Sequence, residues 1–181
     1  MQVSLADNPS MLIREEATTR ATPEQVWAML CDPARHGSWN PRITGTEVYG
    51  SGEPGYGMRY RITYDMSGRS SQFDAEITEF SPPTRFAAKL TERATGDGSN
   101  MDRYMVESYD VSQQRGRTRV VHQVNIHAPG INVFLRALIW LIMHAGHSTR
   151  QTYMEKFARL VEASAATGNQ GSAGDRPAAI A

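Results

Sequence analysis

One short stretch, residues 21–27, reads ATPEQVW and carries the strongest local signal in the chain. Thr22 is a good N-cap residue, and Pro23 falls at the first helical position, where its missing N–H does no harm. Gln25 falls where a capping box has Glu or Gln. The combination predicts that a helix begins here, with an apolar face made of Val26, Trp27 and Leu30. Asp32-Pro33 then ends that helix or begins a second short one.

The segments on both sides of this helix have the pattern of strands. Met11–Thr19 alternates weakly and ends in two threonines, and from Thr44 to His127 short β-rich runs are separated by turn clusters. The six runs are Thr46–Tyr49, Met58–Tyr64, Ser71–Phe80, Phe86–Glu92, Arg103–Val111 and Arg117–His127. Consecutive strands with short links pair as a meander, so we expect one antiparallel sheet.

Alternation inside these runs predicts that the sheet has one buried face. Met58, Tyr60, Ile62 and Tyr64 share one side of their run, whereas Arg59, Arg61 and Asp65 take the other. In the last run, His122 shares a side with Val120, Val124 and Ile126, so this imidazole interrupts an apolar face.

After Pro129-Gly130 the pattern becomes helical. Met154, Phe157, Ala158 and Val161 have the spacing of one helical face. No proline interrupts residues 131–165, which predicts one long helix, bent near Gly146. Extended towards the start of this helix, the same face passes near Trp140, Met143, His144 and His147.

The whole chain fits one domain with two irregular ends. Residues 1–10 have no periodic pattern and are expected to form a flexible N-terminus. Residues 166–181 are rich in Gly, Ala and Ser and are expected to form a disordered tail. We therefore expect a single domain over residues 11–165, a size that can bury a substantial core without disulfides or metals.

The composition excludes some classes of function. Among the 181 residues, 19 Lys and Arg balance 19 Asp and Glu, so no bulk charge draws the chain to nucleic acid. Cys31 is the only cysteine, and its apolar setting at a helix end indicates packing rather than nucleophilic chemistry. Because one cysteine cannot form an internal disulfide and the first residues lack a secretory pattern, we expect a cytoplasmic location.

Several short motifs resemble those of one large superfamily. They are ATPEQVW at 21–27, Cys31-Asp32-Pro33, Trp39-Asn40-Pro41, Gly55-Tyr56-Gly57 before a strand, and Gly116-Arg117-Thr118-Arg119-Val120 at the start of the last strand. Together with the order of strand, two short helices, six strands and long helix, they resemble the START, polyketide-cyclase and pollen-allergen superfamily, often called SRPBCC. The resemblance covers about Met11 to Glu162.

This resemblance implies an α+β helix-grip fold, in which a curved seven-stranded antiparallel sheet wraps around a long C-terminal helix. Two short helices follow the first strand. A bent sheet cannot fill its own concave side, so a gap under the helix persists only if a ligand, water or bulky side chains occupy it. The family implies an elongated, mostly apolar cavity that takes lipids, polyketides or other aromatic compounds, usually without a cofactor.

Aromatic side chains are the first candidates to line such a cavity. They are Trp39, Tyr60, Tyr64, Phe73, Tyr104 and Trp140, for which filling of the core is the alternative. Tyrosine hydroxyls would supply oriented polar contacts in an apolar pocket. His122 is a further ligand-binding candidate, as a hydrogen-bonding group or a general base, with a core histidine as the alternative.

Three acidic residues lie on predicted strands whose phase the sequence leaves open. Exposed positions on the outer face are favoured for Asp74, Glu76 and Glu107, because a buried unpaired carboxylate is costly. A slip of one residue would move each side chain to the other face. Glu107 lies between Met105 and Tyr109, which keeps it among the ligand-binding candidates as an inward-facing alternative.

Two histidines of the predicted helix have a spacing that suits a metal. His144 and His147 are three residues apart, so both imidazoles fall on nearly one face, and a zinc site would need a third ligand such as His122. We favour histidines at the rim or partly buried over a metal site, and we expect no metal. His144 stays a candidate ligand-binding residue.

The most apolar stretch, Ile131 to Met143, is broken by Arg136 and is shorter than the roughly 20 residues that span a bilayer. We favour its burial, or a role in covering the cavity mouth, over transient membrane contact during transfer of a lipid. A dimer contact, and with it a homodimer, is the remaining alternative.

These observations leave more than one function open. We favour a non-catalytic protein that binds or transports a hydrophobic small molecule. The alternative is an enzyme of the polyketide cyclase, aromatase or dehydratase kind, which would use cavity Tyr, His and Glu side chains without a cofactor. Converging polar groups with a shifted pKa would favour the enzyme, and a nearly apolar pocket the binding protein. A co-chaperone-like or stress-response interaction module is a weaker third option.

Overall fold

The structure, a computed structural model, describes residues 2–5, 10–50, 53–65, 70–93, 104–127 and 152–171. The helical elements are α1 (Pro23–Leu30), η1 (Pro33–Arg35), α2 (His36–Trp39) and α4 (Tyr153–Gly171). The strands are β1 (Gln2–Leu5), β2 (Ser10–Thr19), β3 (Ile43–Val48), β4 (Arg59–Asp65), β5 (Ser70–Ser81), β6 (Arg85–Glu92), β7 (Tyr104–Gln114) and β8 (Arg117–His127).

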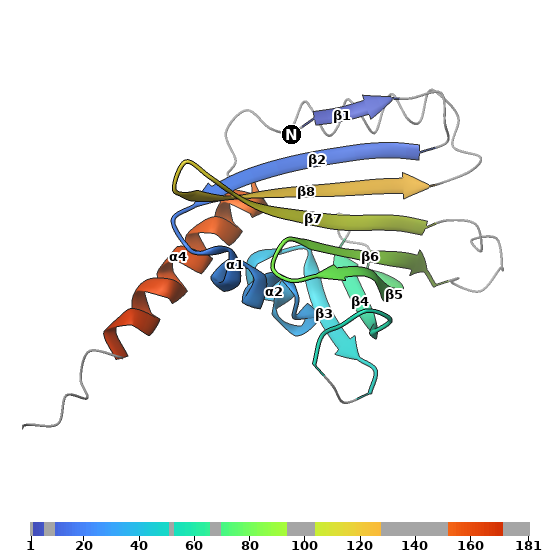
Figure 1. The fold of residues 1–181 in the computed structure, drawn as a ribbon. Coiled ribbons are helices and arrows are strands. Elements are labelled where there is room, and N and C mark those ends of the chain that lie inside the picture. Colours follow the sequence, from blue (N-terminus) through green and yellow to red (C-terminus); the bar gives the residue numbers. More distant parts are fainter. Residues whose placement is uncertain are drawn as a thin grey trace, which may run out of the picture.

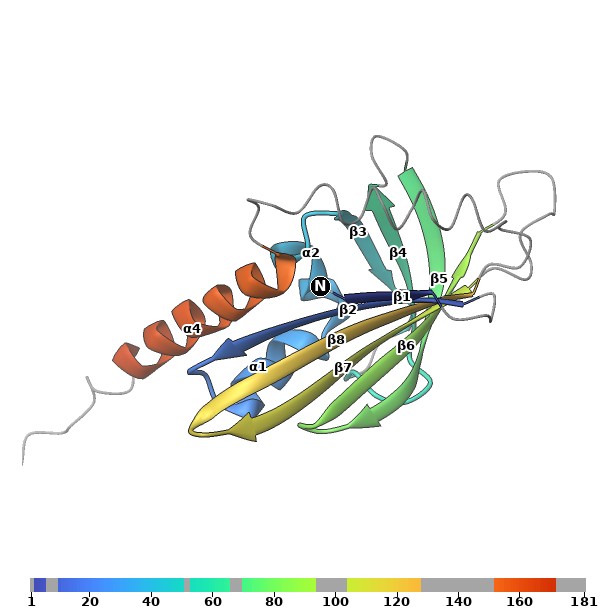
Figure 2. The same cartoon turned by 90° about the horizontal axis from the view of Figure 1, so that it is seen from above.

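One antiparallel sheet contains all the described strands, in the order β1-β2-β8-β7-β6-β5-β4-β3. The seven strands from β2 to β8 confirm the predicted sheet, which bends around α1, α2 and the start of α4 (Figures 1 and 2). The helix-grip prediction is therefore confirmed.

At the edge of the sheet, β1 adds an eighth strand that pairs with residues Met11 to Arg14 of β2. The prediction of a loose segment over residues 1–10 is therefore wrong for Gln2–Leu5. Backbone hydrogen bonds to the edge of β2 order this strand, and such bonds need no apolar periodicity in the sequence.

The short helices begin where the sequence predicts. The Thr22 side chain accepts a hydrogen bond from the backbone N–H of Gln25 at 3.3 Å, and the Gln25 side chain accepts one from the N–H of Thr22 at 2.9 Å. This reciprocal capping box starts α1. Asp32 in turn caps η1 by accepting from the N–H of Ala34 at 3.0 Å, and α2 follows directly. The chain thereby places Trp39, the last residue of α2, inside the core.

The final helix, α4, buries the face that its periodicity predicts, made of Met154, Phe157, Ala158 and Val161. Thr19 at the end of β2 donates to the carbonyl oxygen of Ala158 at 3.4 Å, or to Glu162 at 3.1 Å. The helix continues to Gly171, beyond the predicted boundary at Ala165, because extending an existing helix fixes one residue per added hydrogen bond and no proline intervenes. The predicted earlier part of this helix, over residues 131–151, lies outside the described residues.

Aromatic rings fill the centre of the core on the concave face. The Trp39 ring meets Phe157 of α4 at 5.1 Å between centroids and Tyr109 of β7 at 6.1 Å, both edge to face. A register shift between Ile77 and Glu79 turns the end of β5, so that Phe80 packs against Trp27 of α1 at 5.2 Å. These contacts join the sheet to the helices on its concave side.

Candidate functional site

The concave side of the sheet brings most of the predicted site residues together. Trp39, Tyr60, Tyr64, Phe73, Glu107 and His122 are all buried there, at most 8% exposed. They come from α2 and from four strands, so the fold assembles residues that are far apart in the sequence. Trp140 and His144 lie outside the described residues, as does Ile131 to Met143.

Tyr104 does not join this group. It alternates along β7 with inward-facing Met105, and its ring stacks on His127 with 4.8 Å between centroids. The ammonium nitrogen of Lys89 lies 4.5 Å from the centre of the Tyr104 ring. Since Lys89 lines a hollow on the outer face, the predicted place of Tyr104 in the interior is wrong. The error is one of strand phase.

Glu107 points inward and forms the first polar cluster. The hydroxyl of Tyr64 donates a hydrogen bond to Glu107 Oε1 at 2.8 Å. Burial raises the pKa of the Glu107 carboxyl, and hydrogen bonds from Tyr64 and Tyr109 oppose that rise. The favoured exposed position is therefore wrong for Glu107, because these hydroxyls offset part of the cost of burial.

The sheet explains how Tyr64 reaches Glu107. Two strands, β5 and β6, lie between β4 and β7. Glu107 pairs with Ala88 on the neighbouring strand, and this small side chain leaves the carboxyl uncovered on that side. The sheet bends between β4 and β7 (Figure 2). Tyr64 reaches Glu107 across the two intervening strands, so this contact depends on curvature as well as on sequence.

His122 belongs to a second polar cluster on the same face. Its ring stacks on Tyr109, with 4.5 Å between centroids and 19° between planes, and its Nδ1 lies 2.9 Å from the hydroxyl of Tyr153. Burial lowers the pKa of His122 to about 3, with His36 adding to the effect, so the imidazole is neutral. Glu15 is its direct cross-strand partner on β2, and burial raises the pKa of that carboxyl.

Three polar atoms of this interior lack a hydrogen-bond partner among the described residues. They are Oε2 of Glu15, Nε1 of Trp39 and Nε2 of His122, and all three are buried. An unpaired buried polar atom costs about 1–3 kcal/mol. A polar group of a bound molecule is one kind of partner that would remove this cost.

Sequence reasoning missed Glu15, Tyr109, Tyr153 and His36. Glu15 shares the phase of Ile13 and Ala17, so the weak alternation of β2 already carried a signal for it. Tyr153 directly precedes the buried face of α4, and only the three-dimensional packing places its hydroxyl beside His122. The His36 ring is also buried, with Nε2 2.8 Å from the carbonyl oxygen of Leu30, which is a structural contact.

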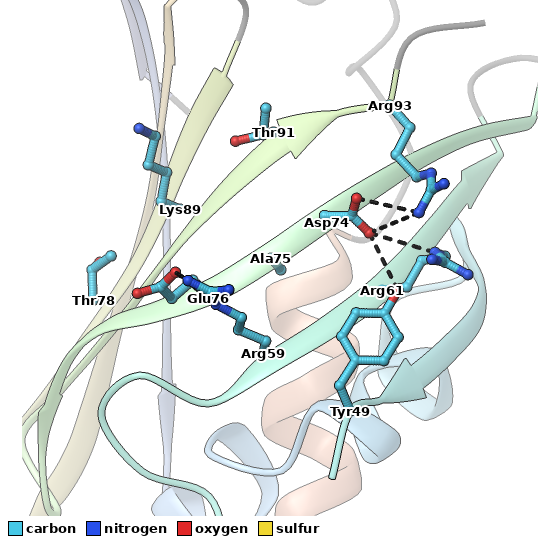
Figure 3. A pocket seen from close by; sticks show the side chains of 10 residues that line it. All are labelled: Tyr49, Arg59, Arg61, Asp74, Ala75, Glu76, Thr78, Lys89, Thr91 and Arg93. Atoms are coloured by element: carbon cyan, nitrogen blue, oxygen red, sulfur yellow. Dashed lines mark hydrogen bonds and ion pairs between the residues drawn. The ribbon is translucent and has the colours of Figure 1, made fainter. Parts of the chain in front are cut away.

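The outer face of β4 to β6 carries a separate hollow of about 680 Å³ lined mainly by charged residues (Figure 3). Asp74 accepts from Arg93 and Tyr49 at 3.3 Å, and Arg61 lies 3.5 Å away. Glu76 pairs with Arg59 at 3.0 Å. Asp74 and Glu76 thus occupy the exposed positions that the sequence favours, and their charges are compensated. Figure 3 shows α4 behind the sheet, so this hollow is separate from the buried clusters.

The described residues contain neither a metal-binding cluster nor a membrane-spanning helix. Within the ranges that the structure describes, no group of three or more His, Cys, Asp or Glu side chains is arranged to hold a metal ion. His144 and His147, for which the sequence favours a rim or partly buried position over a zinc site, lie outside those ranges. No described helix is long and apolar enough to cross a membrane.

Comparisons with known proteins agree with this architecture. The family model described as "Polyketide cyclase / dehydrase and lipid transport" matches residues 11–162. No curated protein matches the sequence. The matched residues extend from β2 to α4 and include both polar clusters.

Solved structures share the fold at low sequence identity. Ara h 8.0201 is 14% identical, with a TM-score of 0.58 over 85% of this chain and 99% of that one. Protein CV1439 from Chromobacterium violaceum is 19% identical, with a TM-score of 0.57 over 83% of this chain and 96% of that one. Major latex-like protein 151 from Panax ginseng is 13% identical, with a TM-score of 0.54 over 87% of this chain and 98% of that one. At these identities the likeness concerns the fold alone.

Proposed function

Because this chain belongs to the polyketide cyclase/dehydrase and lipid transport family, we propose that it binds a hydrophobic small molecule on the concave side of its sheet. The ligand is a lipid, polyketide or other aromatic compound that carries a polar group. Tyr60, Phe73 and Trp39 supply apolar surface, and Glu107 with Tyr64 supplies an anchor for the polar group. A cytoplasmic location, expected from the single cysteine, is part of this proposal.

The observation that carries the proposal is the hydrogen-bonded pair of Glu107 and Tyr64 inside an apolar core. A carboxyl group that serves only to stabilise a fold gains little from burial, because desolvation offsets its hydrogen bonds. Perturbed carboxyl groups of this kind are more frequent at functional sites. The pair presents an acid and a hydroxyl to any polar atom that enters from the concave side.

Binding of prodan, a fluorescent aromatic ketone, tests the proposal. We expect the wild-type protein to bind prodan with a blue-shifted emission, and Tyr64→Phe to weaken binding by roughly 1 kcal/mol, or about fivefold. Tyr104→Phe is the matched control, because it removes the same hydroxyl from the outer face and should leave affinity unchanged.

Native mass spectrometry of the freshly purified protein, followed by extraction, supplies a second readout. A reproducible apolar compound bound in one copy would support the proposal. Absence of both a co-purifying compound and prodan binding would overturn it, as would equal losses of prodan affinity in Tyr64→Phe and Tyr104→Phe.

A second candidate is favoured by the raised pKa of Glu107, namely a cyclase or dehydratase that needs no cofactor. In that case the Glu107 carboxylate would take a proton from the carbon beside a ligand carbonyl, and a tyrosine hydroxyl would stabilise the enolate oxygen. Glu107→Gln separates the two functions: an enzyme would lose turnover of an enolisable diketone, because the introduced amide cannot take the proton. A binding protein would show no turnover in either form.

A further inference from the structure

Two buried side chains and a partly buried tyrosine, from three different elements, lie together. The hydroxyl of Tyr153, at the start of α4, lies 2.9 Å from Nδ1 of His122 on β8. The same hydroxyl also acts on the Glu15 side chain on β2, where hydrogen bonding lowers the pKa of the carboxyl. Glu15 and His122 face each other across the β2–β8 pair and are 5% and 3% exposed. Thr152 fixes the start of α4 by accepting from the N–H of Glu155 at 3.2 Å, which positions Tyr153.

Which group donates and which accepts among Glu15, Tyr153 and His122 depends on a single proton. A hydroxyl group has one proton to donate, so Tyr153 donates either to His122 or to Glu15. If Glu15 is protonated, it donates to the Tyr153 oxygen, Tyr153 donates to Nδ1 of His122, and the imidazole carries its proton on Nε2. If Glu15 is ionised, Tyr153 donates to Glu15, Nδ1–H of His122 donates to the Tyr153 oxygen, and Nε2 is bare.

We propose that the proton on Glu15 selects the tautomer of His122 through Tyr153. Nε2 of His122 thereby presents a hydrogen-bond donor to the ligand when Glu15 is protonated and an acceptor when Glu15 is ionised. The inference rests on the proposed function for its ligand, since Nε2 lies on the concave side that the ligand would occupy.

Two observations indicate that the hydrogen-bonded group of Glu15, Tyr153 and His122 faces the ligand. Nε2 of His122 and Oε2 of Glu15 are the free ends of this group, and both are buried without a hydrogen-bond partner among the described residues. A carbonyl oxygen of a ligand would complete the protonated form, and a ligand hydroxyl or phenol would complete the ionised form. These three residues therefore suit a ligand that has both keto and hydroxyl forms.

The charged groups around these three side chains allow Glu15 to titrate while His122 stays neutral. Burial raises the pKa of Glu15; Arg42 opposes this shift, and Glu155 reinforces it. His122 has a pKa of about 3, because of burial and the neighbouring His36. Burial raises the pKa of the Tyr153 hydroxyl, and the charges of Glu15 and Glu107 add to the rise, so the phenol keeps its proton.

NMR of the ¹⁵N-histidine-labelled full chain, without ligand, tests the inference. The ring nitrogens of His122 are assigned by their contacts with the stacked Tyr109 ring and by the signals that disappear in His122→Asn. We expect the wild-type protein to change from the Nε2–H to the Nδ1–H tautomer in one step as the pH rises through the pKa of Glu15. A single tautomer over the whole pH range in which the protein stays folded would overturn the inference.

Three variants locate the cause of that step. Glu15→Gln and Tyr153→Phe should each make the tautomer independent of pH, whereas Glu155→Gln, which acts on Glu15 by charge alone, should keep the step and move it to lower pH. A tautomer step that persists in Tyr153→Phe would contradict the proposal that Tyr153 couples Glu15 to His122, which we call the relay. If Glu15→Gln or Tyr153→Phe does not fold, as judged by its amide spectrum, two measurements still test the proposal. They are the tautomer step of the wild-type protein and the shift of that step to lower pH in Glu155→Gln.

The two proposals fail separately. Prodan binding without a tautomer step would leave the binding proposal in place and remove the relay. A tautomer step without prodan binding or any co-purifying compound would establish the relay and remove its proposed ligand.

Discussion

The acidity of Glu107 is set by its surroundings rather than by its neighbours in sequence. Burial disfavours the charged form and raises its pKa, whereas the hydroxyl of Tyr64, 2.8 Å away, stabilises the charge and limits the rise. Asp74, on the outer face, is half exposed and meets two arginines instead. Two carboxyl groups of one sheet therefore meet different surroundings because they lie on opposite faces.

We expect Glu107→Gln to change how the free energy of unfolding depends on pH. The unfolded chain releases this proton near 4.5, whereas the folded protein holds it to higher pH. The stabilisation from the bound proton is thus present at low pH and is lost as the pH rises from 4.5 through the raised folded pKa, by at most about 1.4 kcal/mol per pH unit. Urea unfolding at several pH values measures the effect.

The expected sign is that Glu107→Gln gains stability relative to wild type as the pH rises through this window. The introduced amide keeps an acceptor for the Tyr64 hydroxyl, so loss of that hydrogen bond does not mask the trend. A stability difference between Glu107→Gln and wild type that stays constant with pH would contradict the assignment.

At the scale of elements, the outer face of β4 to β6 is held by ion pairs across strands. Asp74 interacts with Arg61, Arg93 and Tyr49, and its side chain is 49% exposed (Figure 3). Exposed ion pairs gain little, because water screens the charges and ordering two long side chains costs entropy. This network therefore organises the surface of the sheet without being a main source of stability.

Asp74→Asn should lower the free energy of unfolding by less than about 1 kcal/mol. The loss should shrink further at high salt, because mobile ions screen the same charges. Chemical denaturation at low and high ionic strength checks both statements. A loss of several kcal/mol, or one insensitive to salt, would mean that Asp74 supports the fold by some route other than exposed charge pairing.

The elements themselves could be predicted well from the sequence, whereas the contacts between them could not. The residues that start α1 are adjacent in the chain, and β8 has the predicted bounds, since capping and alternation are local. The pairing of Glu15 with His122 depends on register across distant strands. The shift between Ile77 and Glu79, which turns Phe80 inward, leaves no mark in simple alternation. Tyr104 was misplaced for a related reason: an error of one residue in phase reverses the face.

At the scale of the whole molecule, α4 depends on a few large side chains for its attachment. Phe157 is fully buried, and its ring lies 5.1 Å from that of Trp39, which α2 supplies. At the next turn, Val161 is also buried, and Glu162 accepts hydrogen bonds from Thr19 and from the N–H of Arg20. The apolar contacts carry most of the energy, because the Glu162 bonds are partly open to water.

Phe157→Ala should therefore destabilise the protein by about 3–5 kcal/mol, the range for removing a buried aromatic ring. Lys156→Ala, the exposed neighbour on the same helix, should change stability by no more than about 0.5 kcal/mol. Thermal or urea unfolding of the two variants makes the comparison. A small effect of Phe157→Ala would show that α4 is held chiefly by something other than this ring.

The overall architecture followed from the sequence because patterns and motifs over residues 11–162 agree with one fold. The buried polar chemistry did not follow, because Glu15, His122 and Tyr153 meet only after the sheet bends and α4 docks. Curvature, register and docking are properties of the assembled chain. The sequence indicated Glu107 and His122 as candidates, and the structure supplied their partners.

The far edge of the sheet is formed by β3, whose register with β4 shifts between Ile43 and Gly45. An open edge offers unpaired N–H and C=O groups to any extended chain, and a long straight edge is a starting point for fibrils. The irregularity breaks that row near Thr44, and the charged side chain of Glu47 further along it disfavours a dry interface. In a crowded solution, the register shift and the charge of Glu47 therefore disfavour the addition of another strand at this edge.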